Sequence, residues 1–208
     1  MNRSFTTVST GGYVNFLAHL FFSGNDPEIL VGNFMGDFVK GRVDDGTPHP
    51  LRDGIMLHRR IDSFAEHHPL FLRSRQRLAP RYGLYRGVMV DLFYDHFLAV
   101  DWEELSPEPL DDWLVRMRMV VEAHRSLLPE RLQGLLPVIF GELIPSYREI
   151  DGIGRAFLRM SQRVRRPNPL AGGEEELSLH YAKLHDDFRR FLPEALEFSK
   201  AFLAASGT

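Results

Sequence analysis

Four predicted helices in the first half of the chain carry Asp or His residues on faces that are otherwise apolar. Residues i, i+4, i+7, i+11 and i+14 of a helix share one face, and two segments show a stripe over that whole span. These stripes read Leu51, Ile55, His58, Asp62, Ala65 and Leu84, Val88, Asp91, Asp95, Leu98. In two shorter segments the inward position is taken by Asp37 and by His19. The helices must therefore pack so that these polar groups find partners.

Helical periodicity runs through the 208 residues, and no alternating run is long enough for a sheet. We therefore expect an all-α chain, with one helical domain over residues 15–205 and a loose extension over residues 1–14. Asp26-Pro27 is a helix-start signal, and Pro69 predicts a break in a long helix. Pro193 predicts a bend or a new helix near the end. The helices are expected at about 15–22, 27–39, 51–78, 84–101, 110–128, 150–164 and 174–205, with short helices between 129 and 147.

Composition excludes several classes of protein. The chain has no Cys, which rules out disulfides, thiolate zinc sites and a Cys nucleophile. A net charge of -3 does not indicate a strongly basic nucleic-acid binder. No apolar stretch is long enough to span a bilayer, and the start lacks the features of a secretory signal. We expect a cytoplasmic protein that binds neither membrane nor nucleic acid, and its oligomeric state stays open.

The inward-facing acids predict a metal site. An isolated buried carboxylate is costly, so buried acids are normally paired or bound to a cation. A divalent metal with oxygen and imidazole ligands would explain all four stripes at once. The expected ligands are His19, Asp37, His58, Asp91 and Asp95. Asp62 is expected not to bind the metal itself, but to orient His58 or to pair with Arg59.

Ordinary salt bridges are the other interpretation of the same stripes. Arg59, Arg60 and Arg86 are near in sequence and could neutralise some of the acids. The last helix serves as a contrast, because His185, Asp186 and Asp187 fall off its apolar stripe and are predicted to be solvated. Solvated side chains need neither a metal nor a salt bridge to offset their charge.

Two segments concentrate arginines in a chain that is acidic overall. They form either ordinary helix surface or a docking surface for an acidic partner, since complementary charge steers association. The candidate docking residues are Arg73, Arg75, Arg77, Arg81, Arg163 and Arg166.

Four motifs resemble the acyl carrier protein phosphodiesterases in both order and spacing. They are NFLAHL at residues 15–20, GNFMGDFVKG at 32–41, LHRRID at 57–62 and VDLFYDHFL at 90–98. The resemblance is specific over about residues 15–102, and the second half is similar only in helical character. It implies an all-helical fold that is distantly like the His-Asp metal-dependent phosphohydrolases.

The resemblance also implies an activity, a metal and a partner. The activity is hydrolysis of the phosphodiester that joins 4′-phosphopantetheine to a Ser of acyl carrier protein. The metal is Mn²⁺, with Mg²⁺ or Fe²⁺ as alternatives. Acyl carrier protein is small and acidic, so the arginines would form the surface to which it docks.

In the expected mechanism the metal activates water, and Arg59 or Arg60 stabilises charge on the phosphoryl oxygens. His96 either protonates the leaving Ser oxygen or orients Asp95. Two other functions stay open. One is a metal-dependent phosphohydrolase for a nucleotide or another small phosphodiester, and the other is a metal-free helical module that binds an acidic protein.

Overall fold

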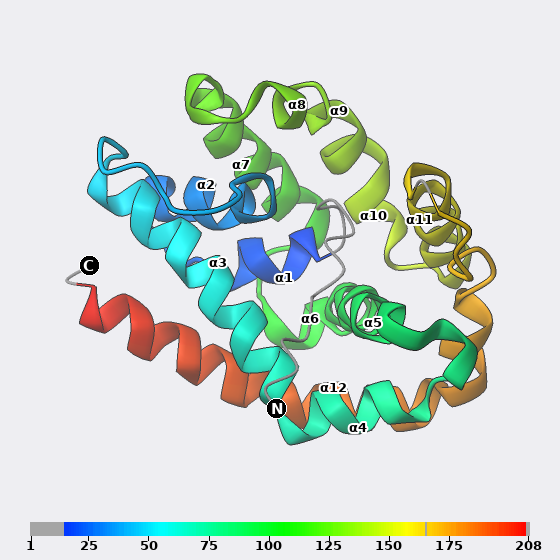
Figure 1. Ribbon diagram of the computed structural model, residues 1–208. Helices are drawn as coiled ribbons and strands as arrows, with labels where there is room; N and C mark the ends of the chain where they lie inside the picture. Colours follow the sequence, from blue (N-terminus) through cyan, green and yellow to red (C-terminus); the bar gives the residue numbers. More distant parts are fainter. Residues whose placement is uncertain (1–14, 165, 207–208) are drawn as a thin grey trace, which may run out of the picture.

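The computed structural model describes residues 15–164 and 166–206, and every regular element in these ranges is a helix. This confirms the all-α prediction, whereas the extension expected over residues 1–14 lies outside the described residues. The longer helices are α1 (Phe16–Phe21), α2 (Pro27–Phe34), α3 (His49–His67), α4 (Pro69–Arg77), α5 (Arg86–Val100), α7 (Leu110–Ala123), α11 (Ile150–Arg163) and α12 (Glu174–Ala205) (Figure 1). Shorter helical turns are η1 (Gly36–Phe38), η2 (Pro80–Tyr85), α6 (Trp102–Leu105), η3 (Arg125–Leu127), α8 (Glu130–Gln133), α9 (Leu136–Val138), η4 (Ile139–Leu143, a π-helical turn) and α10 (Ile144–Ser146).

Prolines and caps set several helix boundaries as expected. The Asp26 side chain accepts hydrogen bonds from two backbone N–H groups of the first turn of α2, and Pro27 takes the first helical position. The predicted break at Pro69 separates α3 from α4. At Pro193, by contrast, α12 continues as one helix of 32 residues. The helix expected over residues 27–39 ends at Phe34, and a separate short turn follows.

Helices α2 and α3 cross at two glycines. A Cβ atom added at Gly32 would lie 2.2 Å from the carbonyl oxygen of Leu51, and one added at Gly54 would lie 2.2 Å from that of Ile29. Real side chains do not tolerate such contacts, so only glycine allows the two backbones to approach this closely. Every residue of α2 from Ile29 to Phe34 is buried, which makes α2 a core element that carries the residues around the candidate site.

The remaining helices enclose this pair. In Figure 1, α1 lies at the centre between α3 and α5, and α12 runs along the lower side of the view, behind α4 and below α3. Helix α12 packs on α3, α4, α5 and α11, and α7 packs on α2. One hydrophobic core extends from Phe16 to Ala195 through both halves of the sequence. Among the described residues, no helix combines the length and the apolar character needed to cross a bilayer.

The prediction that residues 185–187 form a solvated face is wrong for two of the three. Asp187 is fully buried, where its carboxylate accepts hydrogen bonds from Arg73, Arg77 and Ser74. His185 is half-buried, and its Nε2 lies 2.7 Å from Asp101. Helix α12 is covered on more than one side, so its buried surface is wider than a single apolar stripe.

Substitution of Gly54 tests the helix crossing. Gly54→Ala should lower the free energy of unfolding by roughly 3 kcal/mol, because the new methyl group overpacks a backbone contact that cannot relax. This loss exceeds the gain of about 1 kcal/mol that Ala brings to a helix interior. Urea unfolding measures it, and Gly134→Ala is the control because its Cβ would meet only Arg131 O at 3.8 Å. Equal stability of the Gly54→Ala variant and the parent protein would contradict the crossing.

Replacement of Asp187 tests the buried ion pair. Burial by itself raises the pKa of Asp187, but hydrogen bonds from Arg77 and Arg73 outweigh it and hold the pKa below its usual value. The carboxylate therefore stabilises the fold above the unfolded-state pKa of about 4, and this contribution is lost as pH falls through the lower folded-state pKa.

Asp187→Asn should therefore cost about 2 kcal/mol near neutral pH, and the difference from the parent protein should shrink below about pH 4. Unfolding measured across a pH series gives both quantities. Asp186→Asn, at an exposed neighbouring carboxylate, should change stability by less than about 0.5 kcal/mol. A loss for Asp187→Asn that stays constant down to acid pH would contradict this assignment.

Candidate metal centre

His19, His58 and Asp62 meet at one point, although they come from α1 and from two turns of α3. The Asp62 carboxylate lies 3.2 Å from His19 Nε2 through one oxygen and 3.3 Å from His58 Nε2 through the other. The two imidazole rings are stacked with centroids 3.8 Å apart. Both rings are buried, whereas the Asp62 side chain is 44% exposed. Among the described residues this is the group of three whose ligand atoms lie close enough to share a metal ion.

Two further carboxylates surround this group. Asp37, on the turn η1, lies 3.6 Å from His58 Nε2. Burial by itself would raise the pKa of Asp37, but the neighbouring His58 ring holds it below its usual value. Burial and the nearby carboxylates of Asp62 and Asp95 raise the pKa of Asp91 well above its usual value. Asp91 therefore faces a region of concentrated negative charge.

The charge around His58 favours a cation at this position. Burial by itself lowers the pKa of His58, but the carboxylates of Asp62 and Asp37 outweigh it and raise the pKa. Burial also works against ionisation of Asp62, and the charge of His58 and His19 nonetheless lowers the pKa of Asp62. A positive charge among these groups is therefore stabilised, whether a proton or a metal ion carries it.

The donor set fits a divalent metal ion. His19 Nε2 is buried and makes no hydrogen bond, although it lies close to Asp62. A buried nitrogen without a hydrogen bond is costly unless another group binds its lone pair. Two imidazole nitrogens and a carboxylate oxygen are ligands that Mn²⁺, Fe²⁺ and Zn²⁺ accept. The described residues thus contain a His/Asp group that could hold a metal ion.

Asn33 is a part of this site that the sequence analysis missed. It is fully buried on α2, its side-chain oxygen lies 2.8 Å from His19 Nδ1, and its backbone oxygen lies 2.9 Å from His58 Nδ1. The adjacent Gly36 lets the His58 ring pack directly on the backbone, because a Cβ there would lie 2.2 Å from His58 Cγ. The available signal was a polar residue in the apolar run Ile29–Phe34, but as an uncharged amide it did not stand out as the acids and histidines did.

Asp95, one of the expected metal ligands, has its carboxylate at the start of α1. Its two carboxylate oxygens accept hydrogen bonds from the backbone N–H groups of Leu17, at 3.0 Å, and Ala18, at 2.8 Å. It thereby caps the N-terminus of α1, whose own N-cap residue, Asn15, makes no side-chain cap. Both oxygens are engaged, so Asp95 positions the helix that carries His19.

His96 is also separate from the cluster. Its Nδ1 lies 2.7 Å from the carbonyl oxygen of Tyr147, and its Nε2 lies 3.1 Å from the hydroxyl of Tyr181. Burial lowers the pKa of His96. Both nitrogens of this ring on α5 therefore already have partners, one in the residue that follows α10 and one in α12. This arrangement does not support the role expected for His96 as the acid, or as the residue that orients Asp95.

The two arginines expected near the phosphate have different surroundings. Arg59 is half-buried and donates a hydrogen bond to the carbonyl oxygen of Val39, which holds the segment after η1 against α3. Arg60 is exposed. Arg59 thus helps to place Asp37, and the Arg59–Asp62 pair considered from the sequence is replaced by contact of Asp62 with the imidazoles.

The first group of predicted docking arginines is largely occupied within the fold. Arg73 and Arg77, two of the expected docking arginines, both bind the buried carboxylate of Asp187. Arg81 is exposed, with its guanidinium 4.9 Å from the centroid of the Tyr82 ring. Arg75 is half-buried.

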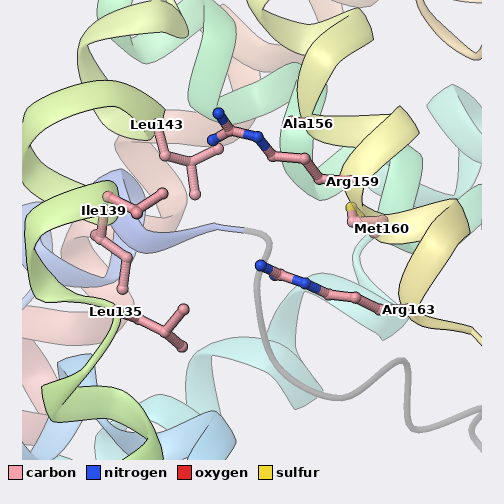
Figure 2. A pocket seen from close by; sticks show the side chains of 8 residues that line it. Leu135, Ile139, Leu143, Ala156, Arg159, Met160 and Arg163 are labelled. Carbon is pink, nitrogen blue, oxygen red and sulfur yellow. The ribbon is translucent and has the colours of Figure 1, made fainter.

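The second group lies at the end of α11 and beyond it. Arg163 and Arg159 extend from α11 toward Ile139 and Leu143, and together these side chains line a small groove (Figure 2). Arg166 is exposed, and it forms no ion pair with any residue of the described ranges. Of the arginines expected to dock a partner, Arg81, Arg163 and Arg166 are exposed and Arg75 is partly exposed.

Comparison with known proteins agrees with the motifs. The family model for acyl carrier protein phosphodiesterase matches residues 14–195. A protein of that name from Klebsiella pneumoniae is 31% identical over 189 residues, which cover 90% of this chain and 98% of that protein. Those from Photorhabdus laumondii and Yersinia pestis are 30% and 32% identical, with 88% and 86% of this chain covered and 94% of each relative.

No solved structure gives a significant match, so the distant likeness to His-Asp phosphohydrolases stays a prediction. The family match, by contrast, spans all four motifs and extends through the second half of the chain, where the motifs gave no specific signal. This chain belongs to the acyl carrier protein phosphodiesterase family.

Proposed function

We propose that the chain is a metal-dependent phosphodiesterase that hydrolyses 4′-phosphopantetheine from the Ser of holo acyl carrier protein. The observation that carries the proposal is the meeting of His19, His58 and Asp62 at one point. Family membership supports the substrate. The donor atoms support Mn²⁺, or another metal of similar ligand preference such as Fe²⁺.

His19, His58 and Asp62 would hold the metal, and we retain Asp37, which lies 3.6 Å from His58 Nε2, and Asp91, whose pKa the carboxylate of Asp62 helps to raise, as candidates for further carboxylate ligands. When bound, a divalent cation supplies an activated water near neutral pH and offsets charge on the phosphoryl oxygens. Asp62 is the half-exposed member of the group and marks the side from which a phosphodiester can enter.

The remaining residues position these groups and the substrate. Asp95 holds α1 and with it His19, and Arg59 holds the segment that follows Asp37. We retain Arg59 and Arg60 as cations for the phosphoryl oxygens, since the hydrogen bond to Val39 uses only one of the five N–H groups of Arg59. His96 is left out of the proposed chemistry, because its nitrogens are bonded elsewhere.

Acyl carrier protein is the proposed protein partner. An acidic partner would be attracted by exposed arginines, and the proposed docking set is now Arg75, Arg81, Arg163 and Arg166. Arg73 and Arg77 are removed from it because they neutralise Asp187.

Mass spectrometry of acyl carrier protein tests the activity. Incubation of the holo form with the enzyme and Mn²⁺ should lower its mass by that of the phosphopantetheine group. His58→Gln and Asp62→Asn should each lower the rate by at least about 100-fold, because both remove an expected ligand. His67→Gln, on the exposed side of the same helix, should keep the parent rate. An unchanged mass with folded, Mn²⁺-loaded protein would overturn the substrate assignment.

Thermal unfolding tests the metal independently of any substrate. Mn²⁺ at about 100 times its dissociation constant should stabilise the fold by about 2.7 kcal/mol, which raises Tm by roughly 5–10 °C for a chain of this size. A chelator should reverse the shift, His58→Gln should abolish it, and His67→Gln should leave it intact. If the parent protein shows no shift with any of Mn²⁺, Mg²⁺ or Fe²⁺, the metal-free interpretation is favoured instead.

A further inference from the structure

Asn33 contacts both imidazoles of the candidate metal centre through different atoms. We propose that Asn33 is a positioning residue that holds His19 and His58 in the tautomer with hydrogen on Nδ1, so that both Nε2 atoms offer lone pairs to the metal. The functional value of this tautomer rests on the proposed metal dependence. The hydrogen bonds that select the tautomer, by contrast, are present in the structure without a metal. Asn33 itself touches neither metal nor substrate.

The amide orientation of Asn33 follows from its neighbours. The hydroxyl of Ser23 donates to the backbone oxygen of His19 at 2.6 Å, which leaves its own oxygen as an acceptor. The Asn33 Nδ2 group lies 3.0 Å from that hydroxyl oxygen and 2.8 Å from the His19 backbone oxygen. Both neighbours accept hydrogen bonds, so the NH₂ group of Asn33 must face them and its carbonyl oxygen must face the His19 ring.

The tautomers of the two rings follow in turn. An amide oxygen can only accept, so His19 Nδ1, at 2.8 Å from Asn33 Oδ1, must carry the hydrogen. The same reasoning applies to His58 Nδ1, which lies 2.9 Å from the Asn33 backbone oxygen. Neutral rings in this tautomer have unprotonated Nε2 atoms, and these are the atoms that face Asp62.

The Asn33 amide decides between two tautomers of His19. Without an acceptor at position 33, a neutral His19 ring would carry its hydrogen on Nε2 and direct it toward the Asp62 oxygen 3.2 Å away. That tautomer would occupy the nitrogen lone pair that the metal needs. Asn33 opposes it, because a ring with hydrogen on Nε2 would turn a lone pair toward the amide oxygen. Partners of this kind commonly change metal affinity by about 10–100-fold.

Histidine ¹⁵N spectra of metal-free protein above pH 8 test the tautomer directly. In the parent protein, His19 and His58 should both show hydrogen on Nδ1, with His19 assigned from the spectrum of the His19→Gln variant. Asn33→Leu should move the hydrogen of His19 to Nε2. His58 should not change, since its acceptor is a backbone oxygen. Asn33→Asp loses the NH₂ group but retains an acceptor toward His19 Nδ1, so it should keep hydrogen on that nitrogen as in the parent protein.

Calorimetric titration with Mn²⁺ measures the consequence. Asn33→Leu should bind Mn²⁺ about 10–100-fold more weakly, and Asn33→Asp should stay within a few-fold of the parent protein. Ser199→Ala removes a comparable buried hydroxyl contact to a backbone oxygen in α12, far along the sequence, and should change neither tautomer nor affinity. If Asn33→Leu does not fold, Asn33→Ala replaces it with the same expectations.

The possible failures are distinguishable. The positioning role is overturned if His19 keeps hydrogen on Nδ1 in the Asn33→Leu variant, which has no acceptor at position 33. It is also overturned if His19 in the parent protein carries hydrogen on Nε2. Equal Mn²⁺ affinity of the parent and Asn33→Leu proteins overturns it as well. A parent protein with the expected tautomers that binds no Mn²⁺ contradicts the proposed metal dependence and leaves the role of Asn33 in setting the tautomers supported.

Discussion

The close crossing of α2 and α3 is the contact on which the candidate site depends. Gly32 and Gly54 let the two backbones meet without intervening side chains, and only at that separation can the Asn33 carbonyl oxygen accept from the ring of His58. A larger residue at either position would move α3 outward and take His58 and Asp62 with it. The close packing of α2 on α3 therefore also fixes the positions of His58 and Asp62 in the candidate site.

Three carboxylates among the described residues meet donors or positive charge in different ways. Half-exposed Asp62 faces two imidazoles, buried Asp95 accepts from the N-terminus of a helix, and buried Asp187 binds two guanidinium groups. Each arrangement answers the same physical requirement, which is that a carboxylate partly or fully removed from water must meet hydrogen-bond donors or positive charge. Only the first of them leaves nitrogen and oxygen lone pairs directed at one point.

Sequence patterns predicted helix boundaries well where neighbouring residues determine them, as at the Asp26 cap and at Pro69. Periodicity also placed His19, His58 and Asp62 on inward faces. It could not tell that the inward carboxylate of Asp95 meets a helix end, since that partner lies 78 residues away in sequence.

Asp187 was misjudged for a related reason, because the number of helices that cover α12 is a property of the whole fold. Asn33 was missed because an amide has no charge to signal its burial.

The cap that Asp95 places on α1 has a consequence for folding. Helix α1 has six residues, which is too short to be stable alone in water. Its stability therefore depends on α5, because the carboxylate that completes its first turn comes from there. His19 is held in place only when this contact across 77 residues or more has formed. We therefore expect a metal ion to stabilise the folded site and not to start the folding of the chain.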